Sequence, residues 1–153
     1  MIVVSDTSPL TALLAIGQSD LLTKLFGDVV IPPAVESELL RTHPDLPAWL
    51  RVQSLRDDAK AAFYARSVDR GEAEAIALAV ELHANHLLID ERKGRRLAQQ
   101  QGLPVLGLLG VVLLAKRARL ILSARELLDR LDREAGIYLA EALKEAALKK
   151  VGE

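Results

Sequence analysis

The chain has 153 residues, of which half are hydrophobic but only 3% are aromatic, and its formal net charge at pH 7 is −1. A chain of this length is most simply one domain, predicted over residues 1–153, with a core of aliphatic side chains. The near-neutral charge excludes a global basic field that attracts nucleic acid, and the shortage of rings argues against recognition by base stacking. The absence of cysteine excludes disulfides, zinc–thiolate sites and cysteine nucleophiles.

Two further features of the sequence concern location. The N-terminus lacks the basic region and the long apolar core of a signal peptide. The most apolar run, residues 105–115, is too short to span a bilayer. Because a chain without cysteine also suits a reducing compartment, we expect a cytoplasmic protein that does not contact membranes.

Short apolar runs alternate with helical patterns along the whole chain. The predicted buried strands are 2–4, 29–31, 86–89 and 105–106, with an edge strand within 49–55. The predicted helices are 10–16, 21–26, 33–40, 57–67, 72–84, 91–101, 108–116, 124–134 and 137–149. The helix over 108–116 is nearly all apolar, so we expect it to be buried. This alternation predicts a three-layer α/β/α fold with a central parallel sheet of four to five strands, and residues 123–153 form a C-terminal helical extension.

Two of the predicted strands run directly into an acid. Asp6 follows the first strand, and Asp90 follows the strand over 86–89. Because the carboxyl ends of parallel strands meet at one edge of the sheet, where ligands of open α/β sheets bind, we expect both acids at that edge. Thr7 or Ser8 is expected to cap the helix that follows.

Helix geometry adds two more acids to this edge. Glu72 lies four residues before Ile76, on the apolar stripe of its helix, whereas Glu74 points away and is expected to be solvated or peripheral. Glu38 flanks the apolar positions of the helix over 33–40 and is favoured over Glu36. Each acid taken alone also has a structural explanation, such as a helix cap or a favourable place in a first helical turn.

Four clustered carboxylates are better explained by a metal ion than by four separate structural roles. Without a cation, like charges held together raise one another's pKa values. Oxygen ligands without His or Cys select Mg²⁺ or Mn²⁺ rather than zinc. Such ions activate water and stabilise the charge that develops when a phosphodiester is cleaved.

The order and spacing of four segments, 4–8, 31–39, 71–79 and 88–92, resemble the PIN-domain family, which includes the VapC-type ribonuclease toxins. The resemblance covers residues 1–110, and the remaining tail is similar to a PIN branch catalogued mainly as uncharacterised. It implies Asp6, Glu38, Glu72 and Asp90 as the catalytic, Mg²⁺- or Mn²⁺-binding acids, although many PIN domains carry aspartate at the position of Glu72. It also implies that Ser8 forms a hydrogen bond near the metal, and Glu91 is a possible additional ligand.

The activity implied by the resemblance is that of an endoribonuclease that hydrolyses RNA through a metal-activated water. The family further implies the toxin of a toxin–antitoxin pair, inhibited by a small antitoxin protein and forming a homodimer. The cations that follow Asp90 are candidate contacts for RNA phosphates, with a solvated helix face as the alternative: Arg92, Lys93, Arg95 and Arg96.

Other functions stay open on the sequence alone. The main alternative is a catalytically inactive PIN-like module that binds RNA or protein. A DNA nuclease of the related 5′-nuclease type is a second. A phosphotransferase with Asp6 as nucleophile is a third, but its second acid is replaced here by Ser8.

Overall fold

A five-stranded parallel sheet forms the centre of the computed structural model, which describes all 153 residues. The strands lie in the order β3-β2-β1-β4-β5. Their bounds are β1 Val3–Ser5, β2 Val29–Ile31, β3 Leu50–Val52, β4 His86–Leu88 and β5 Val105–Leu106. The predicted parallel sheet and its edge strand are confirmed.

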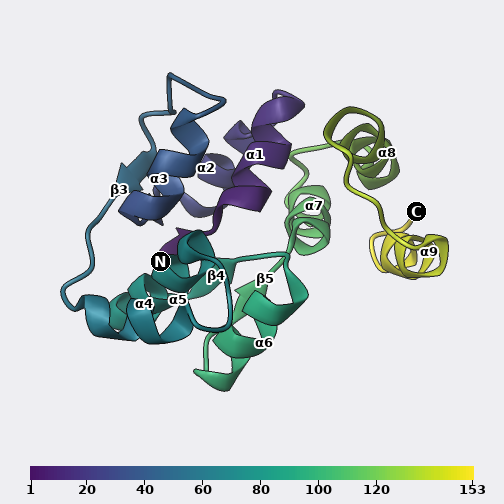
Figure 1. Ribbon diagram of the computed structural model, residues 1–153. Helices are drawn as coiled ribbons and strands as arrows, with labels where there is room; N and C mark the ends of the chain where they lie inside the picture. The colour runs from purple at the N-terminus through teal and green to yellow at the C-terminus, as the bar shows by residue number, and fades with distance from the viewer.

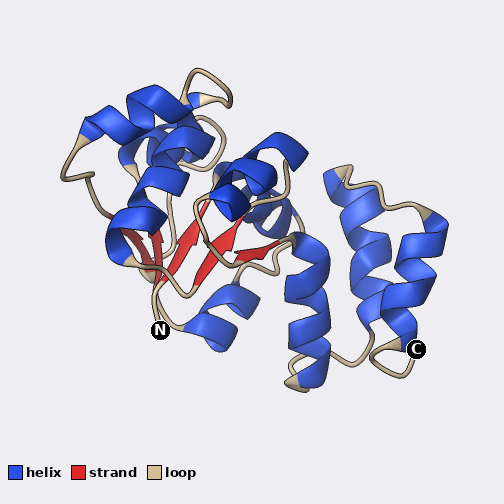
Figure 2. Ribbon diagram, turned by 90° about the horizontal axis from the view of Figure 1, so that it is seen from below, coloured by secondary structure: helices blue, strands red, loops and turns tan.

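Nine helices surround the sheet and lie on both of its sides (Figures 1 and 2). Their bounds are α1 Thr7–Ala15, α2 Asp20–Phe26, α3 Pro33–Leu40, α4 Asp58–Tyr64, α5 Arg70–Leu82, α6 Arg92–Gln100, α7 Leu108–Arg117, α8 Ala124–Ala135 and α9 Glu141–Lys149. The three-layer α/β/α fold expected from the sequence is therefore confirmed. None of these helices combines the length and the apolar character needed to cross a membrane.

Central strand β1 has no solvent-exposed face. Its residues Val3, Val4 and Ser5 are all fully buried, as the lack of polar alternation predicted for Val3 and Val4. The prediction is wrong for Ile2, which lies before β1 and is 39% exposed. Val4 lies opposite Val30 of β2 and Leu87 of β4. Helix α5 packs against β1 and β4, whereas α2 packs against β2. Since β1 is held on all sides, the residue that follows it starts from a rigid position.

The C-terminal helices α8 and α9 stand beside the sheet rather than on it (Figure 1). Helix α8 contacts α1 and α7, and α9 contacts α7. The predicted helix over 137–149 is wrong at its start, because α9 begins only at Glu141. Gly136 ends α8 in the left-handed conformation, at φ 69°. After it Ile137 and Leu139 turn inward, while Tyr138 faces solvent.

Two other details differ from the expectations. Helix α1 begins at Thr7, so Asp6 rather than Thr7 or Ser8 occupies its N-cap position. Helix α7 is only buried along one side: Val111 and Val112 are fully buried, whereas Leu109 and Leu113 are partly exposed. The nearly all-apolar sequence of α7 therefore exceeds what the core requires.

Candidate active site

The carboxyl ends of β1 and β4 bring the first and last predicted acids to one edge of the sheet. Ser5 of β1 lies opposite Leu88 of β4, so Asp6 and Asp90 each follow the end of a neighbouring strand. Glu38 reaches this edge from α3, and Glu72 reaches it from the first turn of α5. Four separate elements thus carry the four acids.

Asp6 is almost completely buried, with 3% of its surface exposed. Burial raises the pKa of Asp6 to about 7, against the opposing effect of the Thr7 amide. The carboxylates of Asp69, Glu38 and Asp90 raise this pKa further. Asp6 is therefore held among like charges, in a place where its ionised form is disfavoured unless a cation compensates for it.

Glu72 is also buried among like charges, and in addition one of its carboxylate oxygens has no partner. Only 6% of its surface is exposed, and its Oε2 atom is buried without any hydrogen-bond partner. Burial raises the pKa of Glu72 to about 8, and the neighbouring Asp69, Asp6 and Glu91 add to the effect. A buried carboxyl oxygen without a partner is costly, so an unpaired one needs an explanation. A ligand that is bound during function would provide that explanation.

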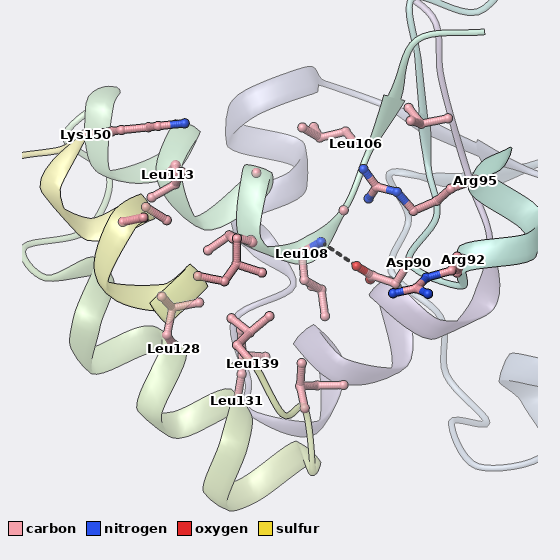
Figure 3. A pocket seen from close by; sticks show the side chains of 18 of the residues that line it. Asp90, Arg92, Arg95, Leu106, Leu108, Leu113, Leu128, Leu131, Leu139 and Lys150 are labelled. Atoms are coloured by element: carbon pink, nitrogen blue, oxygen red, sulfur yellow. Dashed lines mark hydrogen bonds between the residues drawn. The ribbon is translucent and has the colours of Figure 1, made fainter. Parts of the chain in front are cut away.

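The other two acids have partners within the protein. Thr7 donates from Oγ1 to Glu38 Oε2 at 2.5 Å. The amide of Leu108, at the start of α7, donates to Asp90 Oδ1 at 3.0 Å (Figure 3). Although much of Asp90 is exposed, desolvation of its carboxyl raises the pKa, while the Leu108 amide and the charge of Arg95 oppose this.

Three glycines provide the space in which these carboxylates lie. A Cβ atom added to Gly71 would lie 2.5 Å from Glu38 Oε1, and one added to Gly107 would lie 2.7 Å from Asp90 Oδ1. A Cβ atom on Gly94 would overlap Glu72 Oε2. Each of three acids therefore rests directly on a glycine backbone, an arrangement that sequence analysis did not identify.

Asp69 is an acid of this edge that sequence analysis missed. Its Oδ1 accepts the amide N–H of Glu72 at 2.8 Å and so caps α5. The same carboxylate raises the pKa values of Asp6 and Glu72. The signal was present in the sequence, because an acid followed three residues later by Glu is a pattern for a helix start.

The secondary candidates differ in position. Ser8 is exposed and forms no side-chain hydrogen bond, whereas its neighbour Thr7 binds Glu38. Glu91 is exposed at the N-cap of α6 but lies near enough to raise the pKa of Glu72. Arg95 donates to the carbonyl oxygen of Ile89 at 3.3 Å, and its guanidinium lies beside Asp90 (Figure 3). Arg92, Lys93 and Arg96 are exposed on α6.

Glu74 is separate from the four acids, but it is not solvated. Its Oε1 accepts the amide N–H of Ala34 at 3.0 Å, and its Oε2 pairs with Arg70 at 3.2 Å. Only 13% of its side chain is exposed. Of the two expected alternatives, the solvated side chain is wrong, because α5 is enclosed by its neighbours and Glu74 ties it to the first turn of α3. Glu74 is instead peripheral to the four acids.

The donor set fits a hard divalent cation by charge and chemistry, but the side chains do not yet surround one point. All candidate ligands are carboxylate oxygens, and Glu72 Oε2 is an orphaned buried acceptor. No three acidic or histidine side chains are placed so that they could hold one ion together. Binding of an ion therefore requires one or more of these side chains to turn from the partners described above.

Comparison with known proteins gives one clear result. The model of the DUF3368 family, described as a PIN domain, matches residues 2–153, which includes helices α8 and α9. No curated protein and no solved structure matches the chain significantly. PIN domains are generally nucleases, and the parallel sheet with acids at its carboxyl edge agrees with that fold. The chain therefore belongs to the PIN-domain family.

Proposed function

We propose that this protein is a metal-dependent endoribonuclease that hydrolyses RNA phosphodiesters. The observation that carries the proposal is the set of acids that four elements bring to one sheet edge, where Asp6 and Glu72 have pKa values of about 7 and about 8. A structural role for these acids would be served by cationic partners. Neither acid forms an ion pair with Lys or Arg.

The residues that would hold Mg²⁺ or Mn²⁺ are Asp6, Glu38, Glu72 and Asp90, with Glu91 as a further candidate. When bound, such an ion supplies Lewis-acid polarisation of the phosphodiester and lowers the pKa of a nearby water molecule. Asp6 gives the site its fixed point because it follows buried β1 and sits at the N-cap of α1. Glu38 and Glu72 are on helices α3 and α5, and Asp90 lies in the loop between β4 and α6.

The remaining groups of the site act on the RNA itself. Three helices begin at this edge: α1 directly after Asp6, α5 directly after Asp69, and α7 with Leu108, whose amide donates to Asp90. Helix N-termini attract anions, so they favour a phosphate here. The cations of α6 provide further phosphate contacts: Arg92, Lys93, Arg95 and Arg96. Contacts of this kind position a strand without reading its bases.

The family implies further properties that we include in the proposal. The protein acts as the toxin of a toxin–antitoxin pair in the cytoplasm, binds a small antitoxin protein and forms a homodimer. Membership of the PIN-domain family supports these points.

Cleavage of a mixed RNA pool tests the proposal directly. We expect cleavage with Mg²⁺ or Mn²⁺, no cleavage with EDTA, and a loss of at least about 100-fold in Asp6→Asn and Glu72→Gln. Glu74→Gln is the matched control, because Glu74 lies two residues away on the same helix but binds α3 instead. Cleavage that survives Asp6→Asn, or equal losses in Glu72→Gln and Glu74→Gln, would contradict the assigned site. A DNA pool of the same lengths separates the ribonuclease from a DNA nuclease.

A second candidate function is a catalytically inactive PIN-like module that binds RNA or protein. The observation in its favour is that no three acids converge on one point. Binding of Mn²⁺ by the folded protein distinguishes the two candidates. If Mn²⁺ binds and Asp6→Asn abolishes this binding, the acids serve a metal; if Mn²⁺ does not bind and RNA is not cleaved, the inactive module is the better description.

A further inference from the structure

A groove of about 810 Å³ lies between α6, α7, α8 and α9 (Figure 3). Helix α7 and strand β5 form its floor, and α6 forms one wall. The C-terminal helices α8 and α9 form the opposite wall. One end of the groove opens beside Asp90 and Arg95, and the other end reaches Lys150, which directly follows α9 (Figure 3).

The floor of this groove is aliphatic. It includes Leu109 and Leu113, the residues on the half-open side of α7, and Leu139 from the segment before α9. Leu143 of α9 also lines the groove, and 52% of its surface is exposed. Exposed leucines gathered in one concave surface are costly in water and are typical of a surface that binds another molecule. None of the lining residues is aromatic.

The wall formed by α6 is cationic. Arg92, Arg95, Arg96 and Gln99 all line the groove and follow the i, i+3, i+4, i+7 spacing of one helix face. Lys150, at the C-cap of α9, lies across the groove (Figure 3). None of these four cations forms an ion pair, and Asp90 is the only acid among the lining residues. The groove therefore combines an aliphatic floor with net positive charge on its rims, where Asp90 offsets part of the charge of Arg95.

We propose that this groove binds an amphipathic, acidic helix of a partner protein. Aliphatic side chains repeated at helical spacing would pack on Leu109, Leu113 and Leu143. Carboxylates on the flanks of such a helix would meet the cations of α6 and Lys150. An RNA strand matches the rims but not the floor, because RNA is held by aromatic or arginine stacking and gains little from leucines. Binding of such a helix requires only the folded groove and no cleavage, although Arg92, Arg95 and Arg96 are also the proposed RNA contacts.

A designed peptide tests the proposal without knowledge of the natural partner. The probe is a fluorescent peptide of about four helical turns, built from Leu and Glu so that the leucines form one face. We expect saturable binding to the full chain by fluorescence anisotropy, with a Kd on the order of micromolar. The same peptide with Lys in place of Glu should not bind.

Variants of the groove give the decisive comparison. Leu143→Asp should weaken binding about tenfold or more, because it places a carboxylate on the aliphatic wall. Leu122→Asp is the matched control: Leu122 is 96% exposed and lies outside the groove, so binding should not change. Arg96→Glu should also weaken binding of the Glu peptide, because it replaces a cation of the groove with an anion. Arg96 is exposed, so this substitution should not affect folding. Thermal unfolding of each variant checks that it is folded.

Three results would overturn the proposal. Equal affinity of the peptide for Leu143→Asp and Leu122→Asp would place the binding elsewhere. Competition by a short oligoribonucleotide in EDTA, with no effect of Leu143→Asp on the oligonucleotide, would make the groove an RNA track. Self-association that Leu143→Asp abolishes in sedimentation would assign the groove to a second copy of the chain.

Discussion

The carboxylates at the acid edge of the sheet (Asp6, Glu38, Glu72 and Asp90) and those of the C-terminal helices have opposite electrostatic surroundings. At the acid edge, burial and like charges raise the pKa values of Asp6, Glu72 and Asp90. In the C-terminal part, hydrogen bonds from cations or amides lower the pKa values of Glu134, Glu145 and Glu153. Four of the six ion pairs join residues within 116–153: Lys116–Glu153, Arg125–Glu145, Arg130–Glu134 and Lys144–Asp129.

This contrast shows which part of the molecule favours stability and which part favours function. A carboxylate with a raised pKa destabilises the folded state when it is ionised, whereas one with a lowered pKa stabilises it. The acid edge therefore costs stability near neutral pH, a cost that bound cations would offset. In the C-terminal helices most of these acids are paired with cations, which is the arrangement expected where charged side chains have a structural role only.

The largest expected effect is on the pH dependence of stability at Asp6. Because its pKa is raised to about 7 from an ordinary 3.8, the folded state keeps a proton that the unfolded chain has lost. The free energy of unfolding should therefore fall as the pH rises from about 4 to about 7. Asp6→Asn removes this penalty, and relative to wild type it should gain at most about 4 kcal/mol between these limits.

Urea unfolding in EDTA at pH 4 and at pH 8 measures this gain. In the same experiment, Mg²⁺ or Mn²⁺ should stabilise the wild type at pH 8 and should have a much smaller effect on Asp6→Asn. Parallel pH profiles for the two proteins would show that Asp6 ionises in the folded state as it does in the unfolded chain.

The next prediction concerns the glycine beneath Glu72. In Gly94→Ala the added methyl group would collide with Glu72 Oε2 and with Ile89 Cδ1, which lies 2.6 Å away. Because both are ends of side chains, the protein should fold with at most about 2 kcal/mol lost, while the displaced carboxylate should reduce cleavage about tenfold or more. The readouts are urea unfolding and RNA cleavage.

Gly110→Ala in α7 is the control for this substitution. Its methyl group would press on the Leu106 side chain and on no acid. Both variants exchange a helical glycine for alanine, so the change in helix propensity cancels between them. If Gly110→Ala reduces cleavage as much as Gly94→Ala, then the position of Glu72 is not the cause.

The sequence predicted the fold well because each strand has a simple local signal. Residues 2–4, 29–31 and 87–89 are apolar without alternation, a pattern that favours a short strand buried on both faces. The position of Asp6 at a strand end follows from the same signal. Local patterns failed at 137–140, where inward Ile137 and Leu139 suit an extended segment as well as a helix.

The details of the site depend on contacts between distant segments, and a single sequence does not show these. Gly71 lies beneath Glu38, which is on a different helix, and Gly94 lies beneath Glu72. Glu74 faces α3 only because α3 and α5 pack together. Helix periodicity separated Glu72 from Glu74 but gave no information about the neighbour that each side chain meets.

A smaller effect is expected at the C-terminal residue of the structure. Glu153 accepts hydrogen bonds from the amides of Ala124 and Arg125 and from Ser123 Oγ, at 2.6, 3.2 and 3.0 Å. Burial alone would raise the pKa of Glu153, but these donors outweigh it and hold the pKa below its usual value. Glu153→Ala should cost about 1 kcal/mol, as the loss of a helix cap does.

The pH dependence distinguishes a cap from simple packing at this residue. Since the pKa of Glu153 is lowered in the folded state, its contribution should be present above pH 5 and should disappear as the pH falls through the folded pKa. Glu126→Ala, an exposed acid in the first turn of α8, is the control and should show a smaller loss. A cost for Glu153→Ala that stays constant down to pH 3 would contradict the capping role.

The smallest effect is expected for the exposed pair of Arg125 and Glu145. The two side chains meet in a two-pronged contact, at 2.7 and 3.2 Å, but they are 40% and 41% exposed. Water and salt screen such a pair, and ordering two long side chains opposes its formation. Glu145→Gln should therefore leave the melting temperature within the error of measurement, and any difference should vanish in about 1 M NaCl. A clear loss of stability that salt does not remove would mean that the C-terminal helices depend on specific ion pairs, and not on the packing of α8 and α9 against α7.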